Sequence, residues 1–192
     1  MPSLILASSS PYRRALLARL GLDFACHSPH IDERPRPGES GEQLALRLAE
    51  HKAAAVAAEY REGLVIGSDQ VCVNGNQLLG KPGTRENARR QLQAAAGKRV
   101  SFYTGLCVHD IASGRRASLV EPFHVDFRPL TLAQIDRYLD REPALDCAGA
   151  FKCEGLGISL FERMDGRDPN SLVGLPLIAL VDLLTEFGVE VP

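Results

Sequence analysis

The stretch LILASSSPYRRALL, residues 4–17, decides how we expect the chain to begin folding. Its first four residues are apolar, as in a buried strand, and the polar run after them contains the start of a helix. Ser10 supplies a side-chain oxygen that can cap this helix, and Pro11 fits the first helical position because that position needs no backbone N–H. The sequence therefore predicts a strand followed closely by a helix.

The first turn of this helix carries an unusual charge. A helix N-terminus has partial positive charge and four free backbone N–H groups, so acidic residues usually stabilise it. Here the first turn holds Arg13 and Arg14 instead. Two arginines at such a position favour an outside anion such as phosphate, which both the guanidinium groups and the N–H groups can bind. The alternative is a pair of solvated arginines on a surface helix.

The composition excludes several classes of protein. The chain has 192 residues, enough for a full core, and we expect residues 1–192 to form one domain whose lobes, if present, are interleaved. The 22 basic and 24 acidic residues give a net charge of −2, without the basic field of a nucleic-acid binder. The sequence contains no run of about 18 apolar residues, so we do not expect a membrane span, and the N-terminus does not resemble a secretory signal.

Cysteine and histidine usage indicates a reducing compartment. The five cysteines are odd in number and form no CxxC pair, so we expect free thiols in a cytoplasmic protein rather than disulfides or a zinc site. No HExxH motif occurs among the five histidines. Cys26, His27 and His30 make only a weak metal candidate.

Helix and strand patterns alternate along the rest of the chain. We expect further strands at 24–28, 64–73, 77–79, 100–110, 117–127 and 157–162, and helices at 40–60, 84–96, from 131, and at 175–187. Capping boxes mark two of the helix starts, at Ser40 and Thr131, and Asn74-Gly75 is a hairpin signal. Helices mixed with hairpins predict an α/β protein with a mixed sheet.

Asp69 is chemically out of place. An apolar run on each side of it predicts a buried strand, and a buried carboxylate needs a partner such as a cation or a metal ion. The alternative is that residues 67–70 form a turn that exposes the carboxylate.

Two lysines are also unusual. Lys52 falls in the helical stripe formed by Leu44, Leu48 and Val56, so it points from an otherwise apolar face. Its alternative is a side chain that snorkels to solvent. Lys81 lies in a Gly-Lys-Pro-Gly turn that presents its ammonium rigidly, and the alternative is a plain surface lysine.

Taken together, these residues have the chemistry of a polyphosphate site. The cations are Arg13, Arg14, Lys52 and Lys81, and the carboxylates are Glu33 and Asp69. Cations neutralise a phosphate chain, while carboxylates hold a divalent metal ion and orient water. The site is not a Walker A site because no GxxxxGK[ST] motif occurs.

Four motifs carry a resemblance to a known family. The runs LASSSPYRRALLARLG, SDQ around Asp69, GKP at 80–82 and the late CAGAFKCEGLG resemble, in this order, the Maf family of nucleotide pyrophosphatases. The resemblance covers essentially the whole chain. It implies a cytoplasmic hydrolase, often dimeric, that uses Mg²⁺ or Mn²⁺ to split a nucleoside triphosphate into monophosphate and pyrophosphate. The implied fold is inosine-triphosphatase-like: a long mixed α/β sheet with flanking helices and a cleft between two lobes.

The resemblance also implies roles for single residues. Asp69 matches the proton acceptor, and Glu33 with Asp69 would hold the metal ion. The positions that match phosphate and metal handling are Ser10, Arg13, Arg14, Glu33, Lys52 and Lys81.

Three further positions, Tyr12, Gln70 and Glu154, match those that distinguish subgroups of the family, and they resemble the subgroup acting on 7-methyl-GTP. Methylation at N7 makes guanine cationic, so stacking on Tyr12 would gain a cation–π term of roughly 0.5–2 kcal/mol. Glu154 could accept the N1–H and N2–H₂ donors of guanine. Cys153 departs from the expected serine, which puts a polar contact there in doubt. The alternatives are a house-cleaning pyrophosphatase for other nucleotides such as UTP or dTTP, and a nucleotide-sensing regulator of septum formation.

Overall fold

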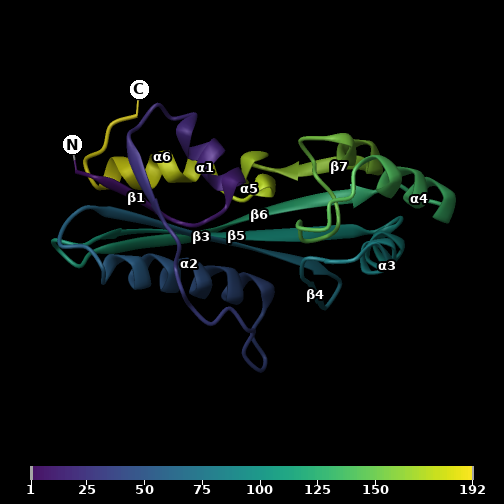
Figure 1. Cartoon of the computed structure of the whole chain (residues 1–192), viewed down its shortest axis with the longest axis horizontal. Helices are drawn as coiled ribbons and strands as arrows, with labels where there is room; N and C mark the ends of the chain where they lie inside the picture. Colours follow the sequence, from purple (N-terminus) through teal and green to yellow (C-terminus); the bar gives the residue numbers. More distant parts are fainter. Residues whose placement is uncertain (1, 192) are drawn as a thin grey trace. The chain divides into compact units, whose positions relative to one another are not determined.

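The computed structural model describes residues 2–191 (Figure 1). Its strands are β1 (Leu4–Ala7), β2 (Phe24–His27), β3 (Leu64–Asn74), β4 (Gln77–Leu79), β5 (Arg99–Asp110), β6 (Arg116–Phe127) and β7 (Phe161–Gly166). Its helices are α1 (Pro11–Ala18), α2 (Gly41–Ala57), α3 (Arg85–Ala95), α4 (Leu132–Arg141), the short 3₁₀ helix η1 (Leu156–Leu160), α5 (Asn170–Val173) and α6 (Leu177–Glu186). Among these residues, no helix is both long enough and apolar enough to cross a membrane.

All the strands of the described residues join one sheet. Its order is β2-β1-β3-β5-β6-β7, and β4 pairs with β3 beside this path. β1 runs parallel to both β2 and β3, whereas β4 is antiparallel to β3 and β7 is antiparallel to β6. Parallel neighbours follow from helical crossovers and antiparallel ones from hairpins. The predicted α/β class with a mixed sheet is therefore confirmed.

The described chain divides into two compact units made of interleaved segments. The first comprises the residues up to Gln70, Tyr103–Glu121 and the residues from Asp168 onward. The second comprises Val71–Phe102 and Pro122–Arg167. The single domain and the cleft between lobes stay predictions.

The sheet of the first unit is buried on both faces. In Figure 1, α2 lies on one face and α1 with α6 on the other. Alternate residues of β1 serve the two sides: Leu4 and Leu6 pack with α1 and α6, while Ile5 and Ala7 pack against α2. Two-sided burial explains why these strands read as continuous apolar runs in the sequence.

Two glycines let α2 approach the sheet closely. A Cβ atom at Gly67 of β3 would collide with the backbone carbonyl of Ala49, and one at Gly105 of β5 would collide with that of Ala45. Any side chain at these positions would push the helix off the strands. The glycines therefore fix how near Lys52 of α2 comes to Asp69 of β3.

In the second unit, α3 and α4 are joined by ion pairs over a core of aromatic rings. Arg89 pairs with Asp136 at 2.8 Å and Arg85 with Asp140 at 2.7 Å. The rings pack edge to face with centroids 4.8–5.7 Å apart. They belong to Phe102, Phe127, Phe151 and Phe161.

One prediction of secondary structure is wrong. The strand expected at 157–162 is instead η1 followed by β7, because the Gly157 N–H donates to Glu142 Oε2 rather than to a strand ladder. The helix expected at 175–187 is confirmed as α6, whereas the separate short helix α5 before it was not predicted. Short apolar runs do not distinguish helix from strand by periodicity alone.

Candidate functional site

The junction between β1 and α1 forms as the sequence predicts. Ser10 has extended backbone angles, and its Oγ accepts the Arg13 N–H at 3.4 Å, with Pro11 as the first helical residue. The buried Ser8 Oγ accepts the Ser10 N–H at 3.1 Å. These two bonds set the path by which the chain turns from strand into helix, directly beside the two arginines.

The two arginines of the first turn have different surroundings. Arg13 is half-buried, and its Nε donates to the Gly174 carbonyl at 2.7 Å, whereas Arg14 is exposed. Burial lowers the pKa of Arg13, and the charges of Asp69 and Glu33 oppose this shift. An arginine remains protonated under such conditions. The solvated alternative is therefore wrong for Arg13 and stays open for Arg14.

Lys52 is the centre of an ion-pair network. Its Nζ donates to Asp69 Oδ1 at 2.5 Å and lies 2.8 Å from Glu33 Oε1. Lys52 is 6% exposed and Asp69 8%, while the Glu33 side chain is 59% exposed on the loop between β2 and α2. The snorkelling alternative for Lys52 and the turn alternative for Asp69 are both wrong.

The two carboxylates of this network have the chemistry to hold a divalent metal ion. Glu33 and Asp69 both lie within 3 Å of one nitrogen, so their oxygens converge on a small volume. Mg²⁺ is commonly held by one or two carboxylates, with phosphate oxygens and waters completing its shell. Within residues 2–191, no group of three or more His, Cys, Asp or Glu side chains is arranged to hold a metal ion. The pair by itself would supply two carboxylate ligands to such an ion.

The weak cysteine–histidine candidate is not supported. His27 hydrogen-bonds Tyr60 Oη at 3.2 Å and lies 3.2 Å from Glu59 Oε2, and Cys26 is an exposed free thiol. His27 therefore uses its ring nitrogens on neighbours outside the proposed cluster.

The sequence did not reveal that α5 is tied to this site. The Gly174 carbonyl accepts two hydrogen bonds, one from Arg13 Nε and one from the buried Ser68 Oγ at 3.1 Å. The Ser171 carbonyl accepts Thr104 Oγ1 at 2.9 Å. Ser68 precedes Asp69 on β3 and Thr104 lies on β5, so α5 is fastened to both strands.

Asp168 holds the start of this segment and was also missed. It is fully buried, and its Oδ1 accepts the Asn170 N–H while Oδ2 accepts the Ile178 N–H, both at 2.8 Å. One carboxylate therefore binds backbone donors at the starts of α5 and α6. The Asp-Pro-Asn sequence at 168–170 is a turn signal that could have drawn attention to it.

Gln70 also contacts α5. Its Nε2 donates to the carbonyls of Ser171 and Leu172, at 2.7 and 3.0 Å. Tyr12 is half-buried on α1. The specificity roles of Gln70 and Tyr12 stay predictions.

The remaining predicted site residues belong to the second unit. Lys81 is exposed in the turn after β4 and lines a cleft of about 440 Å³ beside α3. Glu154 is exposed between α4 and η1, and its Oε2 accepts the Cys153 thiol at 3.5 Å. Burial, reinforced by Glu154, raises the pKa of Cys153 to about 12, so this thiol stays protonated near neutral pH. That Lys81 and Glu154 join Asp69 in one site stays a prediction.

Helix α4 fixes the backbone around Glu154. Glu142 Oε2 accepts the Gly157 N–H at 3.1 Å, and Tyr138 Oη accepts the Lys152 N–H at 3.3 Å and donates to Glu142 Oε2 at 3.2 Å. The loop is therefore held on both sides of its acidic residue.

Comparison with known proteins identifies the family. The profile of the family described as Maf-like protein matches residues 3–187. The chain belongs to the Maf family. It is 58% identical over 191 residues to the 7-methyl-GTP pyrophosphatase of Alcanivorax borkumensis, an alignment that covers 100% of this chain and 97% of that protein. The resemblance inferred from the four motifs is thus confirmed.

Solved structures are more distant from this Maf-family chain. The Staphylococcus aureus Ham1 protein gives a TM-score of 0.48 at 14% identity, covering 66% of this chain and 72% of that one. Protein VC0702 from Vibrio cholerae gives 0.42 at 10% identity, covering 74% and 72%. Neither likeness adds to the assignment.

Proposed function

We propose that this protein is a metal-dependent nucleoside triphosphate pyrophosphatase that hydrolyses 7-methyl-GTP to 7-methyl-GMP and pyrophosphate. The observation that carries the proposal is the full-length, 58% identity to a 7-methyl-GTP pyrophosphatase. The buried pairing of Lys52 with Asp69 beside a cationic helix start supports it, because this arrangement suits water attack on a phosphate chain.

In the proposed reaction, Asp69 is the general base. It takes a proton from water as the water oxygen forms a bond to the α-phosphorus. The bond from the α-phosphorus to the bridging oxygen breaks, and the electron pair leaves with pyrophosphate. Lys52, bonded to Asp69 Oδ1, orients the carboxylate.

Cations neutralise the phosphate groups in this proposal. Arg13, Arg14, Lys52 and Lys81 bind phosphate oxygens, together with the N-terminal N–H groups of α1 beside Ser10. Glu33 and Asp69 would hold a Mg²⁺ or Mn²⁺ ion, which would spread negative charge as pyrophosphate leaves. Arg13 begins this role partly oriented, because its Nε is already bonded to Gly174.

In this proposal, three residues recognise the nucleobase. Tyr12 stacks on the cationic methylated ring, and Glu154 accepts the donors of its Watson–Crick edge. Gln70 shapes the pocket through its hold on α5. We also propose a cytoplasmic location, supported by the five free cysteines, and a homodimer as the oligomeric state.

The test is pyrophosphate release across a panel of 7-methyl-GTP, GTP, UTP and dTTP, with Mg²⁺, with Mn²⁺ and with EDTA. We expect highest kcat/KM on 7-methyl-GTP and loss of turnover with EDTA. Preference for UTP or dTTP would instead favour a house-cleaning role. Asp69→Asn should abolish turnover, and Glu154→Gln should narrow the preference for the methylated base over GTP.

A further inference from the structure

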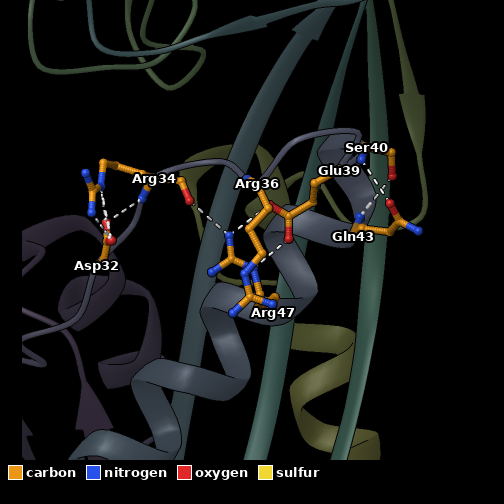
Figure 2. Close-up of polar contacts among 7 residues, drawn as sticks. All are labelled: Asp32, Arg34, Arg36, Glu39, Ser40, Gln43 and Arg47. Carbon is orange, nitrogen blue, oxygen red and sulfur yellow. Dashed lines mark hydrogen bonds and ion pairs between the residues drawn. The ribbon is translucent and has the colours of Figure 1, made fainter.

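An ion pair between Arg47 of α2 and Glu39 anchors the loop that carries Glu33. Residues 28–40 join β2 to α2, and nearly all their side chains are half-buried or exposed. Arg47 of α2 and Glu39, drawn in Figure 2, have side chains that are 12% and 9% exposed, whereas those of the Arg34–Asp32 pair are 87% and 60% exposed. An ion pair shielded in this way differs from the other contacts of the loop.

The anchor binds the loop through a fork of hydrogen bonds. Arg47 Nε donates to Glu39 Oε1 at 2.6 Å, and Nη2 donates to Glu39 Oε2 at 2.8 Å. The same Nη2 donates to the Arg34 carbonyl at 3.1 Å, and Glu39 Oε2 accepts the Arg36 N–H at 2.9 Å. The pair therefore holds the backbone at two points just after Glu33. Only a planar guanidinium can make this set of contacts at once.

The residues on either side of Glu33 form a tight local turn. The Arg34 N–H donates to Asp32 Oδ1 at 3.1 Å, and the Arg34 guanidinium binds the same carboxylate. This turn and the anchor together leave the Glu33 backbone little freedom. The hydrogen bonds from Arg47 lower the pKa of Glu39 to about 2, so its carboxylate is ionised near neutral pH.

Glu33 needs such support because its own contact is weak. Its side chain is 59% exposed, and an ion pair with one exposed partner only partly offsets the entropy of ordering a long side chain on a loop. Arg47 and Lys52 both project from α2, a rigid helix, so the anchor and the ammonium keep a fixed separation.

We propose that Arg47 and Glu39 are positioning residues that hold Glu33 at Lys52 and Asp69, so that the carboxylate is preorganised for the metal–phosphate chemistry of the proposed function. The effect on kcat/KM that this inference predicts rests on the proposed function. In this proposal Arg47 acts through Glu33.

A double-mutant cycle tests the coupling. In the parent enzyme, Arg47→Ala should lower kcat/KM on 7-methyl-GTP by roughly ten- to a hundredfold, because a small misplacement of a catalytic group has that effect. In the Glu33→Gln background the same substitution should change kcat/KM less than twofold. An equal loss in both backgrounds would overturn the proposal, since it would mean that Arg47 acts independently of Glu33.

Two further variants sharpen the cycle. Arg47→Lys keeps the charge but not the fork, so it should behave like Arg47→Ala; full activity would contradict the need for forked contacts. Arg115→Ala is the matched control, because Arg115 also binds a glutamate, Glu186, through its guanidinium at 3.0 Å and lies on an exposed surface. It should leave kcat/KM unchanged.

Hydrogen exchange tests the anchor without turnover. Arg47→Ala should speed amide exchange across residues 32–39 and leave β1 and β3 unchanged, whereas Arg115→Ala should leave 32–39 as in the parent. Unchanged exchange in Arg47→Ala would overturn the inference. If the parent hydrolysed none of the nucleotides, the proposed function would fail and this measurement would still decide whether the anchor holds the loop.

Discussion

Replacing Lys52 by methionine should strongly destabilise the fold. Methionine has a similar length and fits a helix, so the substitution removes the ammonium with little change in packing. It breaks two contacts at once, the 2.5 Å bond to Asp69 and the 2.8 Å pair with Glu33.

The two lost contacts have unequal weights. Asp69 is only 8% exposed, and removing the cation leaves its carboxylate buried and unpaired, which costs about 3–5 kcal/mol. The Glu33 pair is largely exposed and contributes at most about 1 kcal/mol. The free energy of unfolding should therefore fall by about 3–5 kcal/mol in Lys52→Met. Asp69→Asn should be milder, because Lys52 keeps Glu33 as a partner.

Urea unfolding followed by circular dichroism measures these differences. The double variant Lys52→Met/Asp69→Asn replaces the ion pair by neutral groups, and its stability should return to within about 2 kcal/mol of the parent. Lys52→Met and the double variant should both lack pyrophosphatase activity. A loss below 1 kcal/mol in Lys52→Met, or a double variant no more stable than this single one, would refute the buried pairing.

Three other predictions follow from local geometry. Gly67→Ala should lower the free energy of unfolding by about 1–3 kcal/mol and reduce turnover, because the added Cβ would displace α2. Gly80→Ala is the control, because open space surrounds Gly80. Equal stability of the two variants would contradict the close approach of α2 to the sheet. Burial and a nearby arginine lower the pKa of His109 from 6.5, so the unfolded chain binds the proton more readily and stability should fall as the pH drops through about 6.5. His109→Gln should flatten that decline in urea midpoints measured between pH 5 and 8, and an unchanged slope would count against it. Ser10→Ala should cost about 1 kcal/mol by removing the cap of α1, and an unaltered thermal midpoint would show the cap to be dispensable.

Local signals in the sequence were sufficient for most elements. The cap at Ser10, the capping boxes at Ser40 and Thr131, and the strand through Asp69 all formed as predicted. Each depends on residues within a few positions of one another, so the chain encodes them locally. The failures occurred where a distant group decided the outcome, as when Glu142 drew the Gly157 N–H away from a strand ladder.

The candidate site shows the same difference between features encoded locally and features decided by distant groups. The sequence by itself determined which residues are chemically out of place, because Arg13, Lys52 and Asp69 each break the pattern of a local element. It could not tell a buried lysine from a snorkelling one, since both fit the same helical stripe. Only the tertiary structure decided that Lys52 meets Asp69, because their contact depends on Gly67 and Gly105 letting α2 lie close to the strands.

The supporting contacts were beyond the sequence for the same reason. Arg47 and the carbonyls of α5 look ordinary along the chain, and several of the contacts involve backbone groups that carry no residue-specific signal. Which carbonyl meets which side chain is fixed only when helices and strands pack. The sequence thus determined the chemistry of this protein, and tertiary packing decided the geometry that holds that chemistry in place.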